Sequence, residues 1–407
     1  MTGPRPGARL ARFLTSRGAI QDPAWHRAVL AVDRAAFIPE TVWVRDSGDP
    51  AVFRPYPRDT DPDIQRWIYE DYALMIQVDD GHPVGDDGSG RTPTSSISQP
   101  SLVVAMLEAL DVAEGMRVLE VGTGTGYNCA LLCERLGDEN VTSVEVDEGV
   151  AEQARATLDR LGYKPRLLVA DGAEPVDGEQ FDRLLSTVAV RRIPPAWLSA
   201  VRPGGVIVTP WAPGPGFSSA VLVRLVVEET GAASGRIIGD AAFMLMRDHR
   251  YDAVGISAFV NEDAPSVTTG HTTVNPRWVS DRHPGWTVML GHLVPGLGYA
   301  SYEAAEDDFA AAGEASVFVV DRDGDSWALG EYVPQVGQDG YEAKRSGPRD
   351  LWAEIGAARA AWERTGRPGR DRLGLTITPN GTHRLWADEP GRVLSGRHAW
   401  RHQARPG

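Results

Sequence analysis

The segment from Glu120 to Gly126 (EVGTGTG) constrains the fold of this 407-residue chain most strongly, because it joins a strand pattern to a helix pattern. Its glycines let the backbone turn sharply, and the helix that follows presents free N–H groups to a ligand. Short apolar strands then alternate with helices, which predicts the α/β class with a Rossmann-like, doubly wound parallel sheet. The expected strands are Arg117–Gly122, Val141–Val146, Arg166–Val169, Phe181–Thr187 and Val206–Pro210, and the expected helices between them include Tyr127–Arg135 and Gly149–Leu161.

Further elements flank this predicted sheet. Pro100 opens a helix, and Ser98 is expected at or beside its N-cap position. The polar, glycine-rich stretch Asp79–Arg91 cannot build a core and predicts a loop or a flexible flap. Helices are also expected at Ala8–Ser16 and Pro23–Asp33, and edge strands at the end of the sheet at Ala220–Glu229 and Arg236–Met246.

The strand–helix alternation stops after about residue 247, which divides the chain into residues 1–246 and a C-terminal extension, residues 247–407. Helix Leu351–Glu363 and a hairpin turn at Asp321–Asp325 are expected there, so the extension is predicted to be a mixed α+β domain. It holds seven of the twelve tryptophans, which either form its core or hold a peptide. These tryptophans are at 278, 286, 327, 352, 362, 386 and 400, and strands are expected at Ser316–Val320 and Leu375–Thr378.

Composition excludes several kinds of protein. With 41 basic and 56 acidic residues the net charge is −15, which argues against nucleic-acid binding and fits solubility. Cys129 and Cys133 lie four residues apart in a helix pattern, where we expect two buried thiols and neither a disulfide nor a zinc site. No signal peptide or membrane span is recognisable, so a cytoplasmic protein is expected. No metal site is expected, because the candidate histidines lack ligand spacing or a third ligand: His249, His271, His283, His292, His398 and His402.

Acidic residues follow the predicted strands where a nucleoside ligand would need them. Glu145 ends the second strand, 23 residues after Gly122, where a carboxylate can accept both hydroxyls of a ribose. Asp171 and Gly172 follow the third strand, within reach of an adenine edge. The glycine spacing is GxGxG, not the GxGxxG of dinucleotide enzymes, and Glu120 suits a cationic ligand better than a pyrophosphate. Together these positions predict S-adenosyl-L-methionine as the cofactor, in preference to a nicotinamide or a purely structural glycine turn.

A second motif, Ser96-Ile-Ser-Gln-Pro100, precedes the Pro100 helix. With it the chain resembles the protein-L-isoaspartate O-methyltransferases, whose hallmark is a (Thr/Ser)-Ile-Ser-(Gln/Ala)-Pro segment upstream of the cofactor strand. The resemblance covers roughly residues 8–246, and its motifs occur in family order. The matching segments are Leu10–Phe37 with its Asp33-Arg-Ala-Ala-Phe37 element, Tyr69–Ile76, Arg117–Tyr127 and Arg202–Pro210.

The resemblance implies a class I methyltransferase fold in which Ser98 is the active-site serine. A simple helix cap is the alternative role for Ser98. Cofactor contacts, with S-adenosyl-L-homocysteine as the product, are implied for Ser96, Ile97, Glu120, Gly122, Thr123, Gly124, Gly126, Tyr127, Glu145, Val146, Asp171 and Gly172.

The extension distinguishes this chain from ordinary repair enzymes, which end near the equivalent of residue 246. The chain is therefore similar to extended family members that methylate an aspartate in ribosomally synthesised, post-translationally modified peptides (RiPPs). There the ester expels methanol and leaves a succinimide (aspartimide). Our leading hypothesis is methylation of aspartate in a dedicated precursor peptide, and the alternative is repair of isoaspartyl residues in damaged proteins. A peptide-binding module without catalysis is a third possibility. The expected enzyme binds neither a membrane nor a nucleic acid. Its oligomeric state is not assigned from the sequence, and a monomer is compatible with it.

Overall fold

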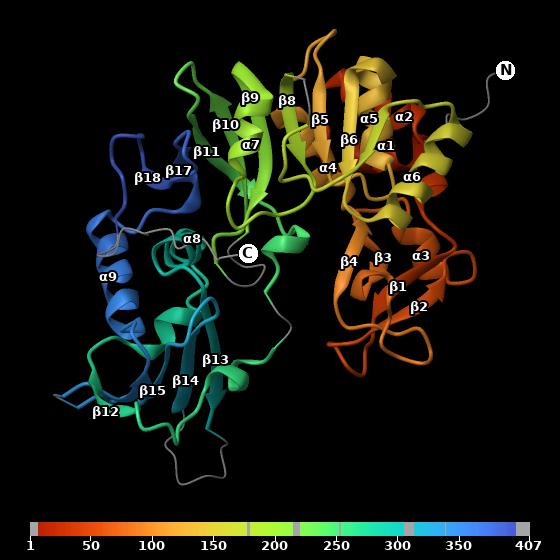
Figure 1. The fold of residues 1–407 in the computed structure, drawn as a ribbon. Coiled ribbons are helices and arrows are strands. Elements are labelled where there is room, and N and C mark those ends of the chain that lie inside the picture. The colour runs from red at the N-terminus through yellow and green to blue at the C-terminus, as the bar shows by residue number, and fades with distance from the viewer. Residues whose placement is uncertain are drawn as a thin grey trace.

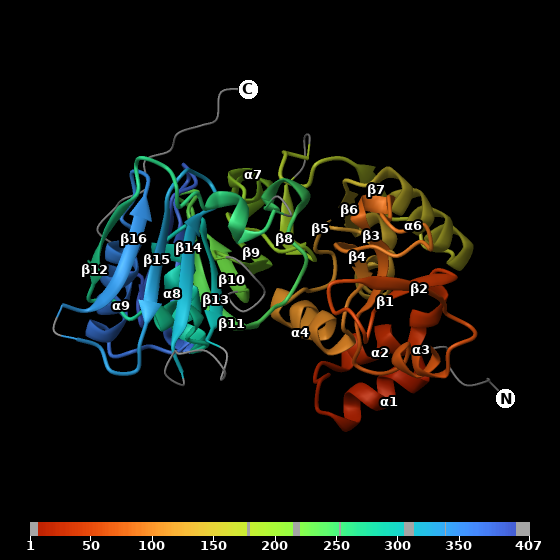
Figure 2. The same ribbon diagram turned by 90° about the horizontal axis from the view of Figure 1, so that it is seen from below.

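The computed structural model describes residues 7–176, 180–214, 220–251, 254–304, 313–337 and 339–395. Their strands form three sheets of four, nine and five strands. The nine-stranded sheet runs across the molecule, with the four-stranded sheet toward the N-terminus on one side and the five-stranded sheet of the extension on the other (Figures 1 and 2). The predicted α/β class is confirmed.

The N-terminal region combines helices with an antiparallel sheet of order β2-β1-β3-β4. One face of this sheet is buried, with Val42 and Leu74 in the core shared with the large sheet. The elements are α1 (Ala8–Ser16), α2 (Pro23–Ala31), η1 (Arg34–Phe37), β1 (Thr41–Arg45), β2 (Phe53–Pro57), α3 (Pro62–Trp67), β3 (Leu74–Val78), η2 (Asp79–Gly81) and β4 (Pro93–Ile97).

The stretch predicted as a loop or flap is attached to this small sheet. The Asp79 carboxylate accepts hydrogen bonds from the backbone N–H groups of Arg91 and Thr92. Phe53 of β2 and Gly90 form a β-bridge with two backbone hydrogen bonds. The stretch is therefore an irregular connection that many polar contacts hold in place.

The parallel part of the large sheet has the order β9-β8-β5-β6-β7, with helices on both faces. The helix predicted at the glycine turn begins at Tyr127, as expected. The elements are α4 (Pro100–Leu110), β5 (Val118–Val121), α5 (Tyr127–Leu136), η3 (Asp138–Asn140), β6 (Val141–Glu145), α6 (Glu148–Leu161), β7 (Arg166–Val169), β8 (Phe181–Ser186), α7 (Pro195–Ala200) and β9 (Val201–Trp211). Cys129 and Cys133 are buried free thiols of α5, as predicted.

The two strands predicted at the edge of the sheet, β10 (Val221–Val227) and β11 (Ala233–Asp240), are interior strands, so that prediction was wrong. The extension adds β17 (Leu373–Ile377) antiparallel to β11, and β18 (His383–Ala387) then forms the edge. The sequence pattern of a strand does not show which strand it pairs with, and the partner of β11 is β17, far along the chain. The large sheet therefore continues across residue 246, the boundary predicted from the sequence.

The rest of the extension is an antiparallel sheet of order β12-β16-β15-β14-β13 packed against helices. Helix α9 and the hairpin turn after Asp321 are as predicted. The elements are η5 (Arg247–His249), η6 (Ile256–Phe259), β12 (Thr268–Thr272), η7 (Pro276–Ser280), α8 (Pro284–Leu293), β13 (Leu297–Glu303), β14 (Ala315–Asp321), β15 (Trp327–Tyr332), β16 (Tyr341–Ser346), α9 (Leu351–Arg364) and η8 (Arg370–Arg372).

The tryptophans of the extension build its interior. Arg359 of α9 places its guanidinium 4.4–5.1 Å from the ring centroids of Trp278, Trp286 and Trp362. Trp286 and Trp362 belong to a single apolar cluster that also contains residues of the large sheet. Five of these tryptophans are buried and Trp278 is half-buried, which supports the core interpretation, whereas Trp400 lies outside the described residues. No helix in the described part of the chain is long and apolar enough to cross a membrane.

Candidate active site

A cavity of about 930 Å³ lies where the carboxyl ends of β5, β6 and β7 meet the N-terminal sheet. Residues 242–248 and Arg250, after β11, form another wall. Every residue predicted from the sequence for the site lines this cavity except Glu120 and Gly126. The lining members are Ser96, Ile97, Ser98, Gly122, Thr123, Gly124, Tyr127, Glu145, Val146, Asp171 and Gly172.

The glycine turn adopts a backbone that other residues rarely tolerate. Gly122, Gly124 and Gly126 have φ angles of +93°, +54° and +84°. A Cβ at Gly122 would lie 2.7 Å from the Thr187 hydroxyl oxygen. A Cβ at Gly126 would lie 3.1 Å from a Leu158 methyl group, so Gly126 faces α6 and not the cavity. Two glycines therefore shape the cavity wall, while the third packs the helix.

Glu145 is held at the wall by the backbone. One carboxylate oxygen accepts from Gly124 N at 2.9 Å, and the other accepts from Val146 N at 3.0 Å and Asp147 N at 3.2 Å. Burial raises the pKa of Glu145 and outweighs the hydrogen bonds, which favour the ionised form. Such a fixed acceptor suits the paired hydroxyls of a ribose.

Asp171 and Gly172 form another part of the cavity wall after β7. Asp171 accepts a hydrogen bond from Ala173 N, and the Trp197 indole N–H donates to Gly172 O at 2.7 Å. A Cβ on Gly172 would lie 2.5 Å from a Val121 methyl group. The backbone here is thus held close to β5, and the Asp171 carboxylate is left beside the cavity.

Glu120 occupies a different place from the one predicted. Its carboxyl is fully buried and accepts from Asn128 Nδ2 and Ser143 Oγ. Burial raises its pKa to about 7. Ser143 in turn contacts Thr123 Oγ1 at 2.7 Å, and Thr123 lines the cavity. The direct contact expected of Glu120 is therefore corrected to a position behind the wall, because its side chain faces α5.

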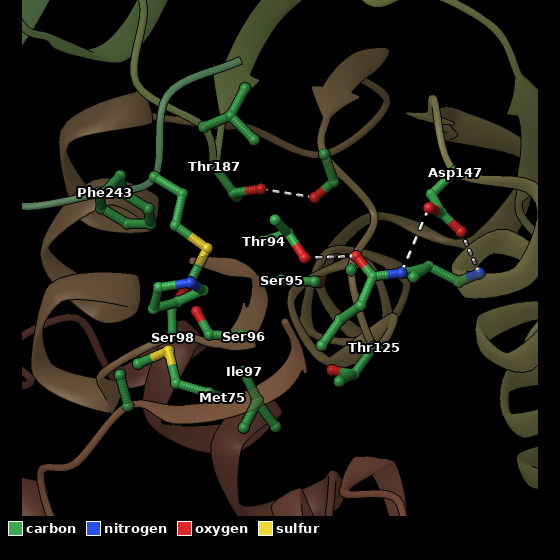
Figure 3. Close-up of a pocket in the computed structure, with 18 of the residues that line it drawn as sticks. Met75, Thr94, Ser95, Ser96, Ile97, Ser98, Thr125, Asp147, Thr187 and Phe243 are labelled. Carbon is green, nitrogen blue, oxygen red and sulfur yellow. Dashed lines mark hydrogen bonds between the residues drawn. The ribbon is translucent and has the colours of Figure 1, made fainter. Parts of the chain in front are cut away.

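The serine motif ends β4 and continues toward α4. Gln99 is the N-cap of α4 and makes no side-chain capping bond, so Ser98 is not the cap that the alternative interpretation expected. Ser98 lines the cavity, as do the apolar side chains of Met75 and Phe243 (Figure 3). Ile97 is buried with its side chain in the core, so it contributes mainly backbone to the site.

Arg34 supports the serine motif and was missed as a functional residue. Its side chain is fully buried, and burial lowers its pKa to about 10, so it stays cationic at neutral pH. The only sequence signal was its place in the Asp33–Phe37 element. Its guanidinium donates to the carbonyl oxygens of Trp67, Ile68, Tyr72, Ile97 and Ser98.

A network of ion pairs at the rim was also missed. Asp147 accepts from Gln77 Nε2 at 3.2 Å and from Arg247 at 3.0 Å (Figure 3). Asp80 pairs with Arg247 and Arg250. This network joins the loop after β3, the start of α6 and the first turn after β11. Only the helix-capping position of Asp147 was visible in the sequence.

The histidines take structural positions. His249 Nδ1 accepts from Arg191 N, and burial lowers the His249 pKa to about 4. Burial likewise lowers the pKa of His292 to about 3 and that of His383 to about 4. The described residues include no group of three or more His, Cys, Asp or Glu arranged for a metal ion, and His398 and His402 lie outside them.

The Rossmann-like sheet, with a glycine turn after β5 and acidic residues after β6 and β7 around one cavity, belongs to an S-adenosyl-L-methionine-dependent methyltransferase. The sequence model described as protein-L-isoaspartate(D-aspartate) O-methyltransferase matches residues 60–231. The chain is 30% identical over 242 residues to the protein-L-isoaspartate O-methyltransferase of Ignicoccus hospitalis, covering 59% of this chain and 96% of that protein. The Methanosarcina mazei protein of the same name is 36% identical over 185 residues, which cover 45% and 68% of the two chains. The chain belongs to the protein-L-isoaspartate O-methyltransferase family.

A solved structure named protein-L-isoaspartate O-methyltransferase shares the fold with a TM-score of 0.53 and 20% identity. The alignment covers 94% of this chain and all of that one, so it necessarily reaches into residues 247–407. An extended chain is therefore compatible with that family fold.

Proposed function

We propose that this protein methylates the free α-carboxylate of isoaspartyl residues in peptides or proteins. The observation that carries the proposal is the meeting of the serine motif with Glu145 and Asp171 around one cavity. The family relatives, named for this activity, support isoaspartate ahead of our leading sequence hypothesis, aspartate in a RiPP precursor.

S-adenosyl-L-methionine supplies a methyl group on a cationic sulfonium. An ionised acceptor carboxylate attacks the methyl carbon, and the C–S bond breaks with its electron pair on sulfur, which leaves a methyl ester and S-adenosyl-L-homocysteine. No general base is needed, because the nucleophile is already an anion. The chain therefore contributes mainly by positioning and by excluding water.

Each wall of the cavity has a part in this positioning. Glu145 accepts from the ribose hydroxyls and Asp171 from the adenine edge. Ser98 donates its hydroxyl to the acceptor carboxylate and holds one oxygen while the other attacks. Met75 and Phe243, apolar lining residues of the same cavity, keep water from the transfer path. The methyl ester then makes methanol the leaving group, so that the neighbouring backbone nitrogen closes the succinimide.

Matched peptides that differ only in isoaspartate or aspartate test the proposal. Mass spectrometry after incubation with S-adenosyl-L-methionine should find a methyl ester on the isoaspartyl peptide. Ser98→Ala and Asp171→Ala should slow its formation, whereas Ser16→Ala, an exposed serine of α1, should not. No ester on either peptide would refute the methyltransferase proposal.

Methylation of aspartate in a dedicated precursor is the second candidate. A cavity wall to which β1 and β2 contribute Trp43 and Phe53 favours it, because apolar side chains there can contact the residues around one chosen aspartate. Ester formation on the aspartyl peptide, followed by loss of methanol, would support this reaction. Activity on arbitrary isoaspartyl peptides with none on aspartate would refute it.

A further inference from the structure

The N-terminal sheet turns one face toward the cavity. Direct cross-strand partners share a face, so Pro55, Trp43, Met75 and Ser96 form a row across all four strands. Trp43, Met75 and Ser96 line the cavity. The row therefore leads outward from the serine motif along a continuous wall.

The wall is apolar and fixed. The Trp43 indole N–H donates to Gly88 O at 3.0 Å, which holds its ring in place. Phe53, two residues before Pro55 in β2 and on the same face, is only 5% exposed, and the Arg45 guanidinium covers its ring at 4.6 Å. Rigid aromatic side chains bind a peptide with little loss of conformational entropy.

Two arginines of the cavity lie on the side of the small sheet, whereas two of its carboxylates lie on the cofactor side. Acidic side chains, Glu145 and Asp171, lie at the ends of β6 and β7, on the cofactor side. Arg45 and Arg91 are exposed lining residues on the side of the small sheet. Within the described ranges neither of them has a carboxylate at ion-pair distance, unlike Arg247 and Arg250 of the rim. Although the chain as a whole has a net charge of −15, Arg45 and Arg91 form a local positive site that can bind an anionic partner.

From this geometry we propose that the cavity face of the small sheet binds the peptide that flanks the acceptor. An apolar side chain packs on Trp43 and Met75, and an acidic side chain pairs with Arg45 and Arg91. The proposal rests on the proposed function and adds a substrate preference to it: acceptors in acidic sequence. β1 and β2 precede residues 60–231, which match the family model.

Three fluorescein-labelled isoaspartyl peptides, with glutamate, glutamine or lysine on both sides of the acceptor, test the preference. Dissociation constants come from anisotropy titrations in the presence of S-adenosyl-L-homocysteine. The unaltered protein should bind the glutamate peptide roughly tenfold more tightly than the lysine peptide at low salt, and the difference should shrink as salt is added.

Charge reversal supplies the matched comparison. Arg45→Glu combined with Arg91→Glu should invert the order of the peptides, whereas Arg12→Glu with Arg364→Glu, two exposed arginines outside the cavity, should leave it unchanged. Unchanged binding of S-adenosyl-L-homocysteine would show that the first double variant is folded. Equal binding of the three peptides by the unaltered protein, or the same order after reversal, overturns the proposal.

Methylation of the glutamine peptide is measured separately. Absence of ester there would refute the proposed function, while the dissociation constants would still decide whether the wall selects acidic peptides. Ester formation together with equal dissociation constants for the three peptides would refute only the specificity proposal. The two failures are therefore distinguishable.

Discussion

Replacing Arg34 with methionine should both destabilise the N-terminal region and slow methyl transfer. Arg34 has no exposed surface and joins segments that are far apart in sequence. Three of its contacts are short: 2.8 Å to Ile68 O, 2.7 Å to Tyr72 O and 3.1 Å to Ser98 O. Methionine fills similar volume but donates nothing, so these buried carbonyl groups lose their partners.

Two opposing contributions set the size of the effect. Burial lowers the Arg34 pKa to about 10, and this downward shift corresponds to about 3 kcal/mol against keeping the charge inside. Methionine removes that cost. Against this, a hydrogen bond from a charged donor contributes about 1.5–3 kcal/mol, and each buried carbonyl left unpaired costs about 1–3 kcal/mol. We expect a net loss of about 3–5 kcal/mol in the free energy of unfolding.

Urea denaturation compares the protein with Arg34→Met, Arg34→Lys and Arg12→Met, where Arg12 is an exposed arginine of α1. Lysine keeps the charge but reaches fewer carbonyls, so it should recover part of the loss, and Arg12→Met should lose almost nothing. A loss below about 1 kcal/mol for Arg34→Met would refute the inferred network.

The positioning role has its own measurement. At a temperature where Arg34→Met is folded, kcat should fall while the affinity for S-adenosyl-L-homocysteine stays close to that of the unaltered protein. The reason is that Arg34 holds the backbone at Ser98 and does not line the cavity. An unchanged kcat would mean that Arg34 serves stability alone.

Three further substitutions probe separate parts of the molecule. Glu145→Gln replaces one acceptor oxygen of the ribose position by a donor, so calorimetry should show roughly tenfold weaker binding of S-adenosyl-L-homocysteine. Glu120→Gln should flatten the pH dependence of stability. Because the Glu120 pKa is raised to about 7, the folded protein keeps this proton between about pH 4.5 and 7, whereas the unfolded chain releases it. The unaltered protein therefore loses stability as pH rises through that window. Unfolding at pH 5 and pH 8 measures the difference, and equal slopes would contradict the assignment. Arg359→Met removes a cation enclosed by tryptophans and paired with Asp281, and should lower the free energy of unfolding by about 2–3 kcal/mol; a loss confined to a few tenths would argue against a stabilising role.

Local patterns predicted the cofactor half of the molecule. Apolar runs of strand length, each followed by a helical pattern, were sufficient to predict that the strands around β5 are parallel. Right-handed crossover connections leave few alternative arrangements. The glycine turn and Glu145 follow from the same logic, since ligand-binding residues in such sheets gather at the carboxyl ends of the strands. These features need only short-range information, and the structure has them where they were expected.

Other features depend on partners distant in sequence. Nothing near Ala233 in sequence indicates that β17 will pair with β11, since the two strands lie more than a hundred residues apart. Nothing in the sequence indicated that Arg34 is buried, because an arginine is ordinarily exposed. Glu120 was expected to contact the cofactor, but its carboxyl lies behind the cavity wall. The alternation of side chains along a strand shows which face a residue is on only when the register of the strand is known.

The shared sheet also changes how the extension can influence the reaction. Strands β17 and β18 complete the sheet that carries the cofactor site, and the main apolar cluster contains residues from both halves of the chain. The connection between the halves passes through residues 242–248 and Arg250, which line the cavity, and His249 there accepts a hydrogen bond from Arg191 of the methyltransferase half. A movement of the extension would therefore reach the acceptor side of the cavity through this covalent and hydrogen-bonded wall, without direct contact between the extension's tryptophans and substrate.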